Sequence, residues 1–163
     1  MAATGKWVVN ASPLICLGKL RRLDWLGQLA SEFVVPFGVA TEIEGGPPDD
    51  PARQWLQAVG SVHVRRVGEI PAEIAGWDLG RGESEVLAWA RENRGYVAIL
   101  DDRAARRCAD VFNVSVCGTV GILMRAKREG LVNSLTAALD DAAKVGLYVS
   151  PAVRREALRL LGE

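Results

Sequence analysis

The stretch "VAILDDRAARRCADVF", residues 97–112, indicates the fold class more directly than any other part of the sequence. Four apolar residues at 97–100 are followed by two aspartates and then by apolar residues at helical spacing. A short run that is apolar throughout suits a strand buried on both faces of a parallel sheet. We therefore expect a strand at 97–100 that leads into a helix at about 102–113.

The same alternation of short apolar runs and helical patterns extends along the whole chain. Strands are expected at 6–9, 33–36, 62–67, 97–100 and 114–116. Helices are expected near 12–20, 23–31, 37–45, 50–59, 71–78, 82–94, 102–113, 119–129, 134–145 and 151–161. Strands separated by helices need crossover connections, so the pattern predicts an α/β fold with a parallel sheet covered on both faces.

Composition is compatible with one domain over residues 1–163, because a chain of this length buries a sizeable core without disulfides or a structural metal. No apolar stretch reaches the roughly 18 to 20 residues of a transmembrane helix, and "MAATGKWVV" lacks the features of a secretory signal. Twenty basic residues balance twenty acidic ones, so a nucleic-acid partner would have to be held by a local patch.

Cysteine and histidine content excludes several kinds of site. The three cysteines, Cys16, Cys108 and Cys117, are odd in number, far apart and in apolar contexts. This pattern favours buried thiols in a reducing cytoplasm over a disulfide framework or a zinc site. The one histidine, His63, rules out a histidine-based metal cluster and is expected to be structural.

Polar residues follow the apolar runs at the ends of three expected strands. Asn10 follows the run at 6–9, Asp101 and Asp102 follow the run at 97–100, and Thr119 closes the "CGT" segment after 114–116. Ligands of open parallel sheets bind outside the carboxyl ends of the strands. We therefore expect these side chains to approach one another at one edge of the sheet.

Helical phase adds Glu83 and Glu42 to this group. The apolar stripe of the helix near 82–94 runs through Val86, Leu87 and Ala90 and projects back onto Glu83, whereas Glu85 lies on a different face. Glu42 lies on the border of the inner face of its helix.

The helix after Asp101 has an equally clear phase. Its inner face is expected to consist of Ala104, Ala105, Cys108, Val111 and Phe112. This phase places Asp101 at the inward end and directs Arg103, Arg106 and Arg107 outward.

Each of these polar residues has a structural explanation when taken singly, as a helix cap or as a charge that suits the helix dipole. Taken together, several carboxylates at one sheet edge repel one another unless a cation joins them. Magnesium accepts oxygen ligands without histidine or cysteine, and such a site suggests hydrolysis of phosphodiester bonds. Neither "GGPPDD" nor "LGRGES" completes a P-loop, and "VCGTVG" lacks the lysine of a receiver-like phosphoryl-accepting pocket.

Five segments in one order resemble the PIN-domain family, namely "VVNASPLI" (8–15), "VVPFGVATEI" (34–43), "LGRGESEVLAWA" (79–90), "AILDDRAAR" (98–106) and "VCGTVGILMRAKREGLV" (116–132). The tail "GLYVSPAVRREALRLLGE" also fits, and the chain is most similar to a subgroup classified as a domain of unknown function. Members of the family are metal-dependent ribonucleases that include VapC-like toxins of toxin–antitoxin pairs.

The resemblance implies a three-layer α/β/α sandwich with a mainly parallel central sheet and an acidic pocket for Mg²⁺ or Mn²⁺. Matched by position, the metal ligands are Asn10, Glu42, Glu83 and Asp101, of which Glu42, Glu83 and Asp101 are the catalytic acids. Asp102 and Glu85 are possible substitutes. Ser12 and Thr119 are expected polar contacts to substrate. The outward-facing Arg103, Arg106 and Arg107, together with Arg81 before Glu83, are expected to hold RNA phosphates, although a solvated helix face with local ion pairs would explain any one of them.

The resemblance also implies a cytoplasmic protein, an RNA substrate, a small antitoxin partner and a homodimer, with exposed apolar positions at 12–31 available for either protein contact. Asn10 departs from the family pattern, which has an aspartate there. At an effective dielectric of about 20, one missing charge interaction is worth on the order of several kcal/mol before desolvation offsets it. An alternative function is therefore an RNA- or protein-binding module that has lost cleavage.

Overall fold

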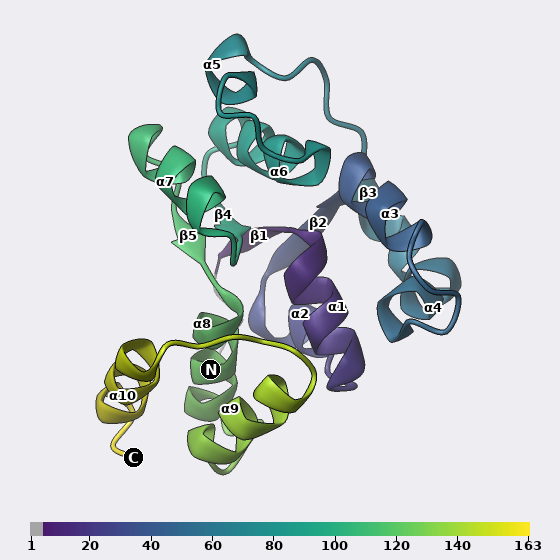
Figure 1. Ribbon diagram of the computed structural model, residues 1–163. Coiled ribbons are helices and arrows are strands. Elements are labelled where there is room, and N and C mark those ends of the chain that lie inside the picture. The colour runs from purple at the N-terminus through teal and green to yellow at the C-terminus, as the bar shows by residue number, and fades with distance from the viewer. Residues whose placement is uncertain (1–4) are drawn as a thin grey trace.

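The computed structural model, which describes residues 5–163, contains a five-stranded parallel sheet with helices on both faces (Figure 1). The strands are β1 (Lys6–Val9), β2 (Glu32–Pro36), β3 (Val64–Arg65), β4 (Tyr96–Ile99) and β5 (Val116–Cys117). They lie in the order β3-β2-β1-β4-β5, and every neighbouring pair is parallel. The predicted α/β fold class is confirmed.

β1 lies at the centre of the sheet because its sequence can be buried on both sides. Val8 and Val9 are 0% exposed, and so are Ala98 and Ile99, their register partners on β4. Such continuous apolarity is what a doubly covered parallel strand requires. The centre of the sheet is therefore also the centre of the hydrophobic core.

The helices follow the expected pattern, with ends that differ from the predicted ones by a few residues. They are α1 (Ala11–Lys19), α2 (Trp25–Leu29), α3 (Phe37–Glu44), α4 (Pro51–Ala58), α5 (Ala72–Ala75), α6 (Arg81–Glu92), α7 (Arg103–Val111), α8 (Thr119–Arg128), α9 (Leu135–Lys144) and α10 (Pro151–Leu160). None of the helices in the described part of the chain has the length and apolarity that a membrane crossing needs.

Two predicted segments differ from the structure. The run at 62–67 is mostly not a strand: a 3₁₀ helix occupies Gly60–His63, and β3 has only two residues. Its side chains are largely exposed or half-buried at the sheet edge, so little burial extends the pairing. The inner face predicted for α7 is wrong at Val111, which is 61% exposed at the end of that helix.

The prediction that the cysteines are buried thiols holds for two of the three. All three thiols are free, with Cys16 and Cys108 buried and Cys117 half-buried. Burial raises the pKa of the Cys16 thiol to about 11, and the negative charge of Asp101 adds to the rise. The negative charge of Asp101 therefore acts on the buried Cys16 side chain of α1.

Glu163 connects the end of the chain to α9. Its carboxylate accepts hydrogen bonds from the backbone N–H of Leu135 at 2.6 Å and of Thr136 at 3.1 Å, at a helix start whose N-cap is Ser134. These bonds satisfy donors that have no partner within the helix. They lower the pKa of Glu163 to about 2.

The close packing of α1 on α4 depends on Gly18. A Cβ atom at Gly18 would lie 2.8 Å from the backbone nitrogen of Ala52, whereas a Cβ at Gly27 in α2 would meet nothing within 4 Å. We expect Gly18→Ala to destabilise the protein by about 1–3 kcal/mol through overpacking. Gly27→Ala, the matched control, should be neutral or stabilising because alanine favours helix. Urea unfolding of both variants tests this, and equal stabilities would contradict it.

The Glu163 cap predicts a pH dependence of stability. Its folded pKa of about 2 lies below the ordinary value of 4.5, so its contribution is complete above about pH 4.5 and is lost as the pH falls through 2. We expect wild type to melt at a higher temperature than Glu163→Gln at neutral pH, with the difference closing between pH 4.5 and 2. Thermal unfolding followed by circular dichroism measures this difference, and a gap independent of pH would refute the assignment.

Candidate functional site

The strand order reverses between β1 and β4, so this is the switch point of the sheet. From β1 the chain adds β2 and β3 on one side, and from β4 it adds β5 on the other. The backbone N–H of Asn10 donates to the carbonyl oxygen of Ile99 at 3.1 Å, so the carboxyl ends of β1 and β4 are adjacent. In open parallel sheets this reversal leaves a crevice at the strand ends. Asn10 and Asp101 follow the two strands that border it.

Asn10 is buried and its side-chain oxygen is unpaired. The residue is 4% exposed, and Oδ1 has no hydrogen-bond partner among the described residues. Asn10 is the N-cap of α1 but makes no side-chain capping bond, and the helix begins at Ala11, one residue before the predicted start. A buried carbonyl oxygen without a donor is costly. Capping therefore does not explain this carboxamide.

Glu42 and Glu83 share a small pocket with Asn10. The pocket has a volume of about 330 Å³, and its walls also include Ser12 and Arg81. Gly82 brings the three groups together: a Cβ there would lie 3.3 Å from Glu42 Oε2 and 3.5 Å from Asn10 Oδ1. The absence of a side chain at Gly82 lets the start of α6 lie against them.

The carboxylates in and near the pocket lie close enough together to change the pKa of Glu83. The pKa of Glu83 is raised, first by burial and then by the charges of Asp102 and Glu42. The backbone N–H of Gly80, which donates to Glu83 at 3.3 Å, and the side chain of Asn10 offset part of the rise. A cation in the pocket would relieve this repulsion.

Glu85 is the more buried carboxylate of α6, but it does not line this pocket. It is 4% exposed and accepts hydrogen bonds from the backbone N–H of Gly38 at 3.0 Å and from Arg81 Nε at 2.8 Å. A Cβ at Gly38 would lie 2.3 Å from Glu85 Oε2. Glu85 therefore joins α6 to α3, and Glu83 is the acid directed to the pocket.

Asp101 lines a neighbouring groove and is bonded to Thr119. Its Oδ1 accepts from the backbone N–H of Thr119 at 2.7 Å, and its Oδ2 accepts from Thr119 Oγ1 at 2.6 Å. Gly118, the N-cap of α8, has no side chain to cap that helix. Asp101, which follows the neighbouring strand β4, caps it instead. The groove that Asp101 lines is distinct from the pocket of Asn10, Glu42 and Glu83.

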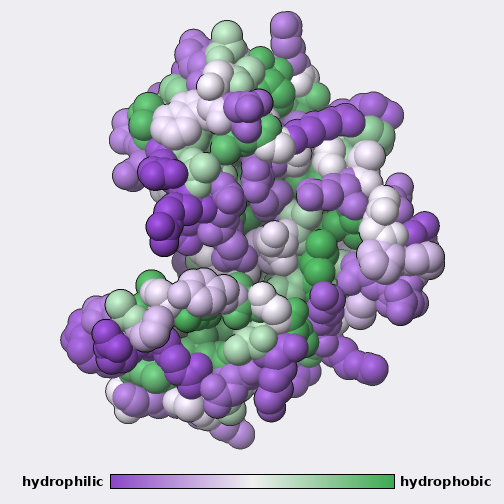
Figure 2. Space-filling view, in the orientation of Figure 1, coloured by the Kyte–Doolittle hydropathy of each residue, from purple (hydrophilic) through white to green (hydrophobic). Residues whose placement is uncertain are grey.

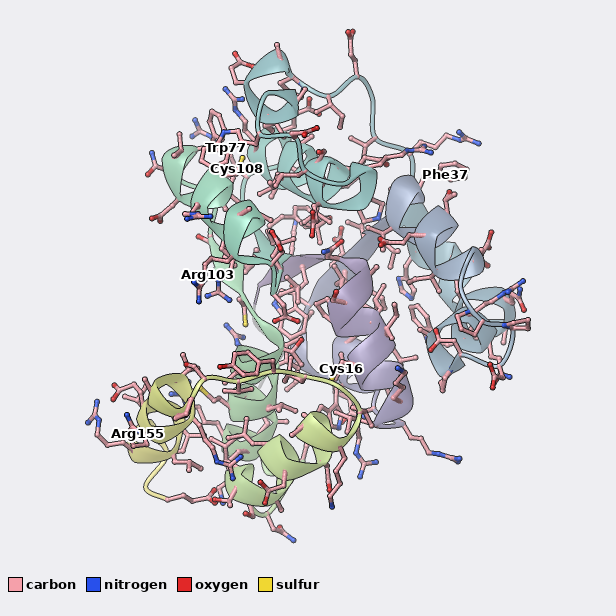
Figure 3. The ribbon with its side chains drawn as sticks, viewed as in Figure 1. Cys16, Phe37, Trp77, Arg103, Cys108 and Arg155 are labelled. Carbon is pink, nitrogen blue, oxygen red and sulfur yellow. The ribbon has the colours of Figure 1, made fainter. Side chains whose placement is uncertain are left out.

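The remaining predicted residues divide between these two places. Asp102 caps α7 through the backbone N–H of Ala105 at 2.9 Å while its charge acts on Glu83. Ser12 is exposed and lines the small pocket. Arg103 and Arg107 line the groove with Asp101, and Figure 3 shows Arg103 extending from α7 toward the opening above α10.

Thr119 is 0% exposed with both donors on Asp101, so it positions that acid and is closed to substrate.

Among residues 5–163, no three aspartate, glutamate, histidine or cysteine side chains form a metal-binding cluster. The pocket offers instead two carboxylates and the unpaired amide oxygen of Asn10. Magnesium is commonly held by one or two carboxylates together with water and substrate phosphate. The donor set of the pocket fits such an ion.

Sequence patterns missed three features of this region. Gly82 and Gly118 matter through the side chains that they lack, and Tyr148 lies on the rim of the groove from a distant part of the chain. The sequence gives no periodic signal for a residue in the link between α9 and α10.

A comparison with family profiles matches residues 6–163 to the PIN domain. The chain belongs to the PIN-domain family. A search of curated proteins finds no match. Membership in the PIN-domain family indicates a nuclease-type function, an RNA substrate and use of a divalent metal. The paired strand ends and the oxygen-rich pocket of this PIN domain are consistent with that class.

The two bonds between Thr119 and Asp101 predict a measurable coupling. Thr119→Val removes the hydroxyl donor and keeps the shape, so we expect a loss of about 1.5–3 kcal/mol of unfolding free energy, the range for a bond to a charged group. Thr119→Ser retains the donor and should lose less. In a double-mutant cycle by urea unfolding, Thr119→Val should cost less in an Asp101→Ala background. Strict additivity would show that the hydroxyl does not hold Asp101.

Proposed function

We propose that this PIN-domain protein is a metal-dependent endoribonuclease that hydrolyses RNA phosphodiester bonds. The observation that carries the proposal is the buried, unpaired Oδ1 of Asn10 in a pocket with Glu42 and Glu83. Buried polar groups in proteins are nearly always hydrogen-bonded, so this unpaired carbonyl oxygen calls for a partner. A hard divalent cation is the partner that the surrounding carboxylates favour.

Asn10, Glu42 and Glu83 are the residues that would hold Mg²⁺ or Mn²⁺, with Asp102 as a nearby negative charge. A bound divalent ion supplies an activated water and neutralises charge on the phosphate and the leaving oxygen. Burial and the charges of Asp102 and Glu42 raise the pKa of Glu83 in the absence of a cation, and a bound ion would oppose this rise.

Asp101 is the fourth proposed acid, and its role differs from that of the pocket residues. Both of its oxygens accept hydrogen bonds from Thr119, which fixes the carboxylate at the boundary between β4 and the groove. Arg103 and Arg107, which line the same groove, would contact the phosphates that flank the scissile bond. Ser12, exposed at the small pocket, is the proposed hydroxyl contact to substrate on the other side.

A second candidate function rests on Asn10 itself. An amide oxygen coordinates a cation without contributing a negative charge, so this PIN domain would bind its metal more weakly than one with aspartate. The alternative is a PIN domain that retains RNA or protein binding and cleaves weakly or not at all.

The biological role proposed is that of a cytoplasmic toxin held in check by a small antitoxin, and it rests on the resemblance to VapC-like toxins. Three free cysteines support a reducing compartment. A homodimer is proposed on the same resemblance, but not through the segment 12–31. The large apolar side chains that the described residues expose lie elsewhere, at Val59, Val62, Val111, Tyr148, Val153 and Leu160.

Cleavage of labelled single-stranded RNA in Mn²⁺ tests the proposal. We expect wild type to cleave, EDTA to abolish cleavage, and Asp101→Ala, Glu83→Gln and Glu42→Gln to lower the rate at least about tenfold, as loss of a positioned acid or charge does. Glu44→Gln is the matched control, because Glu44 is exposed on the same helix as Glu42 and does not line the pocket.

Asn10→Asp separates the two candidate functions. If the protein is an enzyme, the wild type should cleave RNA. The added charge of Asn10→Asp should then lower the Mn²⁺ concentration needed for a half-maximal rate. Activity that appears only in Asn10→Asp would identify the natural protein as a binding module. Cleavage that survives both Asp101→Ala and Glu83→Gln would remove the proposed site.

A further inference from the structure

We propose that the groove beside Asp101 is a binding site for single-stranded RNA, with phosphates on Arg103 and Arg106 and one base stacked on Tyr148. The proposal extends the proposed ribonuclease function and rests on it for the identity of the nucleic acid. Helical phase already directs Arg106 outward with Arg103 and Arg107, whereas no sequence pattern gives Tyr148 a role.

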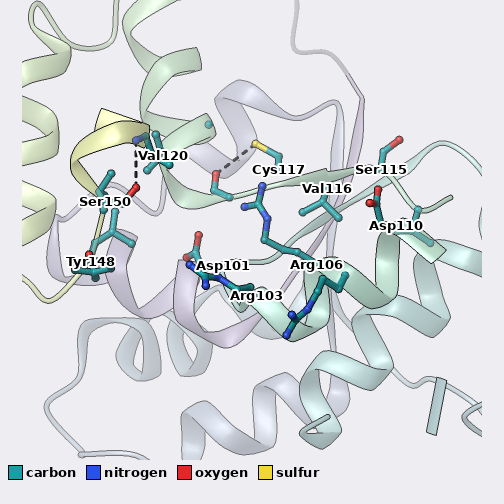
Figure 4. A pocket seen from close by; sticks show the side chains of 17 residues that line it. Asp101, Arg103, Arg106, Asp110, Ser115, Val116, Cys117, Val120, Tyr148 and Ser150 are labelled. Carbon is teal, nitrogen blue, oxygen red and sulfur yellow. Dashed lines mark hydrogen bonds between the residues drawn. The ribbon is translucent and has the colours of Figure 1, made fainter. Parts of the chain in front are cut away.

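The groove is the largest of the described cavities, with a volume of about 1110 Å³. Its walls come from α7, β5, the start of α8, and the link between α9 and α10. In Figure 2 a hollow separates the part of the molecule that contains α7 from the part that contains α10, and hydrophilic residues gather on the α7 side. Asp101 lies in the groove, so a strand lying along it would pass the proposed catalytic acid (Figure 4).

Arg106 lies next to Asp101 and makes a hydrogen bond to the backbone there. Its Nη1 donates to the carbonyl oxygen of Leu100 at 3.4 Å. A Cβ at Gly118 would lie 2.7 Å from Arg106 Nη1 and 3.0 Å from Asp101 Oδ1, so the glycine leaves room for both groups. An arginine placed in this way presents its remaining N–H groups to the groove, where they match a phosphate oxygen pair.

The positive charge of the groove is available to a ligand. Among the described residues, Arg103, Arg106 and Arg107 make no ion pair, although all three are exposed. Asp101 and Asp110 are the carboxylates in the walls, and Asp101 is already bound by Thr119. Three guanidinium groups without ion pairs in one concave surface favour a polyanion.

Tyr148 supplies the base contact on the opposite wall. It is 84% exposed, the highest value among the large apolar side chains that the structure exposes. Figure 4 places its ring at the end of the groove near Ser150, across from the arginines of α7. An exposed ring beside a basic groove is the arrangement with which proteins stack bases of single-stranded nucleic acid. Bases in duplex RNA are stacked on one another and are closed to such a ring, which makes the single strand the preferred form.

Fluorescence anisotropy with a labelled oligouridine of about ten nucleotides, a length within the range of such sites, tests the proposal on the full chain in EDTA. We expect Tyr148→Ala to weaken binding about tenfold and Tyr148→Phe to restore it, since phenylalanine keeps the stacking face. Arg106→Ala should weaken binding and reduce its dependence on salt concentration. Arg155→Ala is the charge-matched control, because Arg155 is exposed on α10, points away from the groove in Figure 3 and should leave binding unchanged.

Circular dichroism of each variant confirms that the fold is retained. Binding that is unaffected by both Tyr148→Ala and Arg106→Ala overturns the proposal, and so does equal affinity for a duplex of the same length. A groove that binds an acidic peptide but not the oligouridine would be a protein-docking site and would also overturn it. Because EDTA removes the metal, loss of binding and loss of cleavage are separate results, so the proposed ribonuclease function can fail while this proposal stands.

Discussion

The parallel pairing of β1 with β4 is the interaction on which the rest of the structure depends. Four side chains of this pair, Val8, Val9, Ala98 and Ile99, are 0% exposed, so the two strands cannot shift against each other without exposing the core. A fixed register also fixes the positions of the residues that come directly after each strand. Asn10 is therefore beside the end of β4, where Asp101 leaves the sheet on the side of β5.

The region beyond these strand ends consists of two compartments with different electrostatics. In one, burial and then the charges of Asp102 and Glu42 raise the pKa of Glu83, and the side-chain oxygen of Asn10 is unpaired. In the other, Asp101 is satisfied by Thr119 and is surrounded by arginines without ion pairs. Under the proposed function, the first compartment would hold a cation and the second a polyanion. A phosphodiester is negatively charged, so it would meet complementary charge from the arginines of the second compartment and from a cation held in the first.

Glycines and capping bonds, as much as the acids themselves, bring the site together. Gly82 lets α6 approach Asn10 and Glu42, and Gly118 makes room for Arg106 beside Asp101. Glu85, two residues after Glu83, joins α6 to the backbone of Gly38 and so keeps the helix in place. A side chain at either Gly82 or Gly118 would separate groups that the proposed chemistry needs close together.

The sequence alone determined the order of strands and helices and most of the buried stripes of α6 and α7, because apolar periodicity is a local property of the chain. Only the tertiary structure decided that β3 shortens to two residues, that Thr119 is closed to substrate, and that Asp101 faces a different compartment from Glu83. It also brought Tyr148 to the groove of Asp101, a placement that depends on how α8, α9 and α10 pack after the sheet is complete. Such contacts arise between segments far apart in the chain, and no local pattern of residue types encodes them.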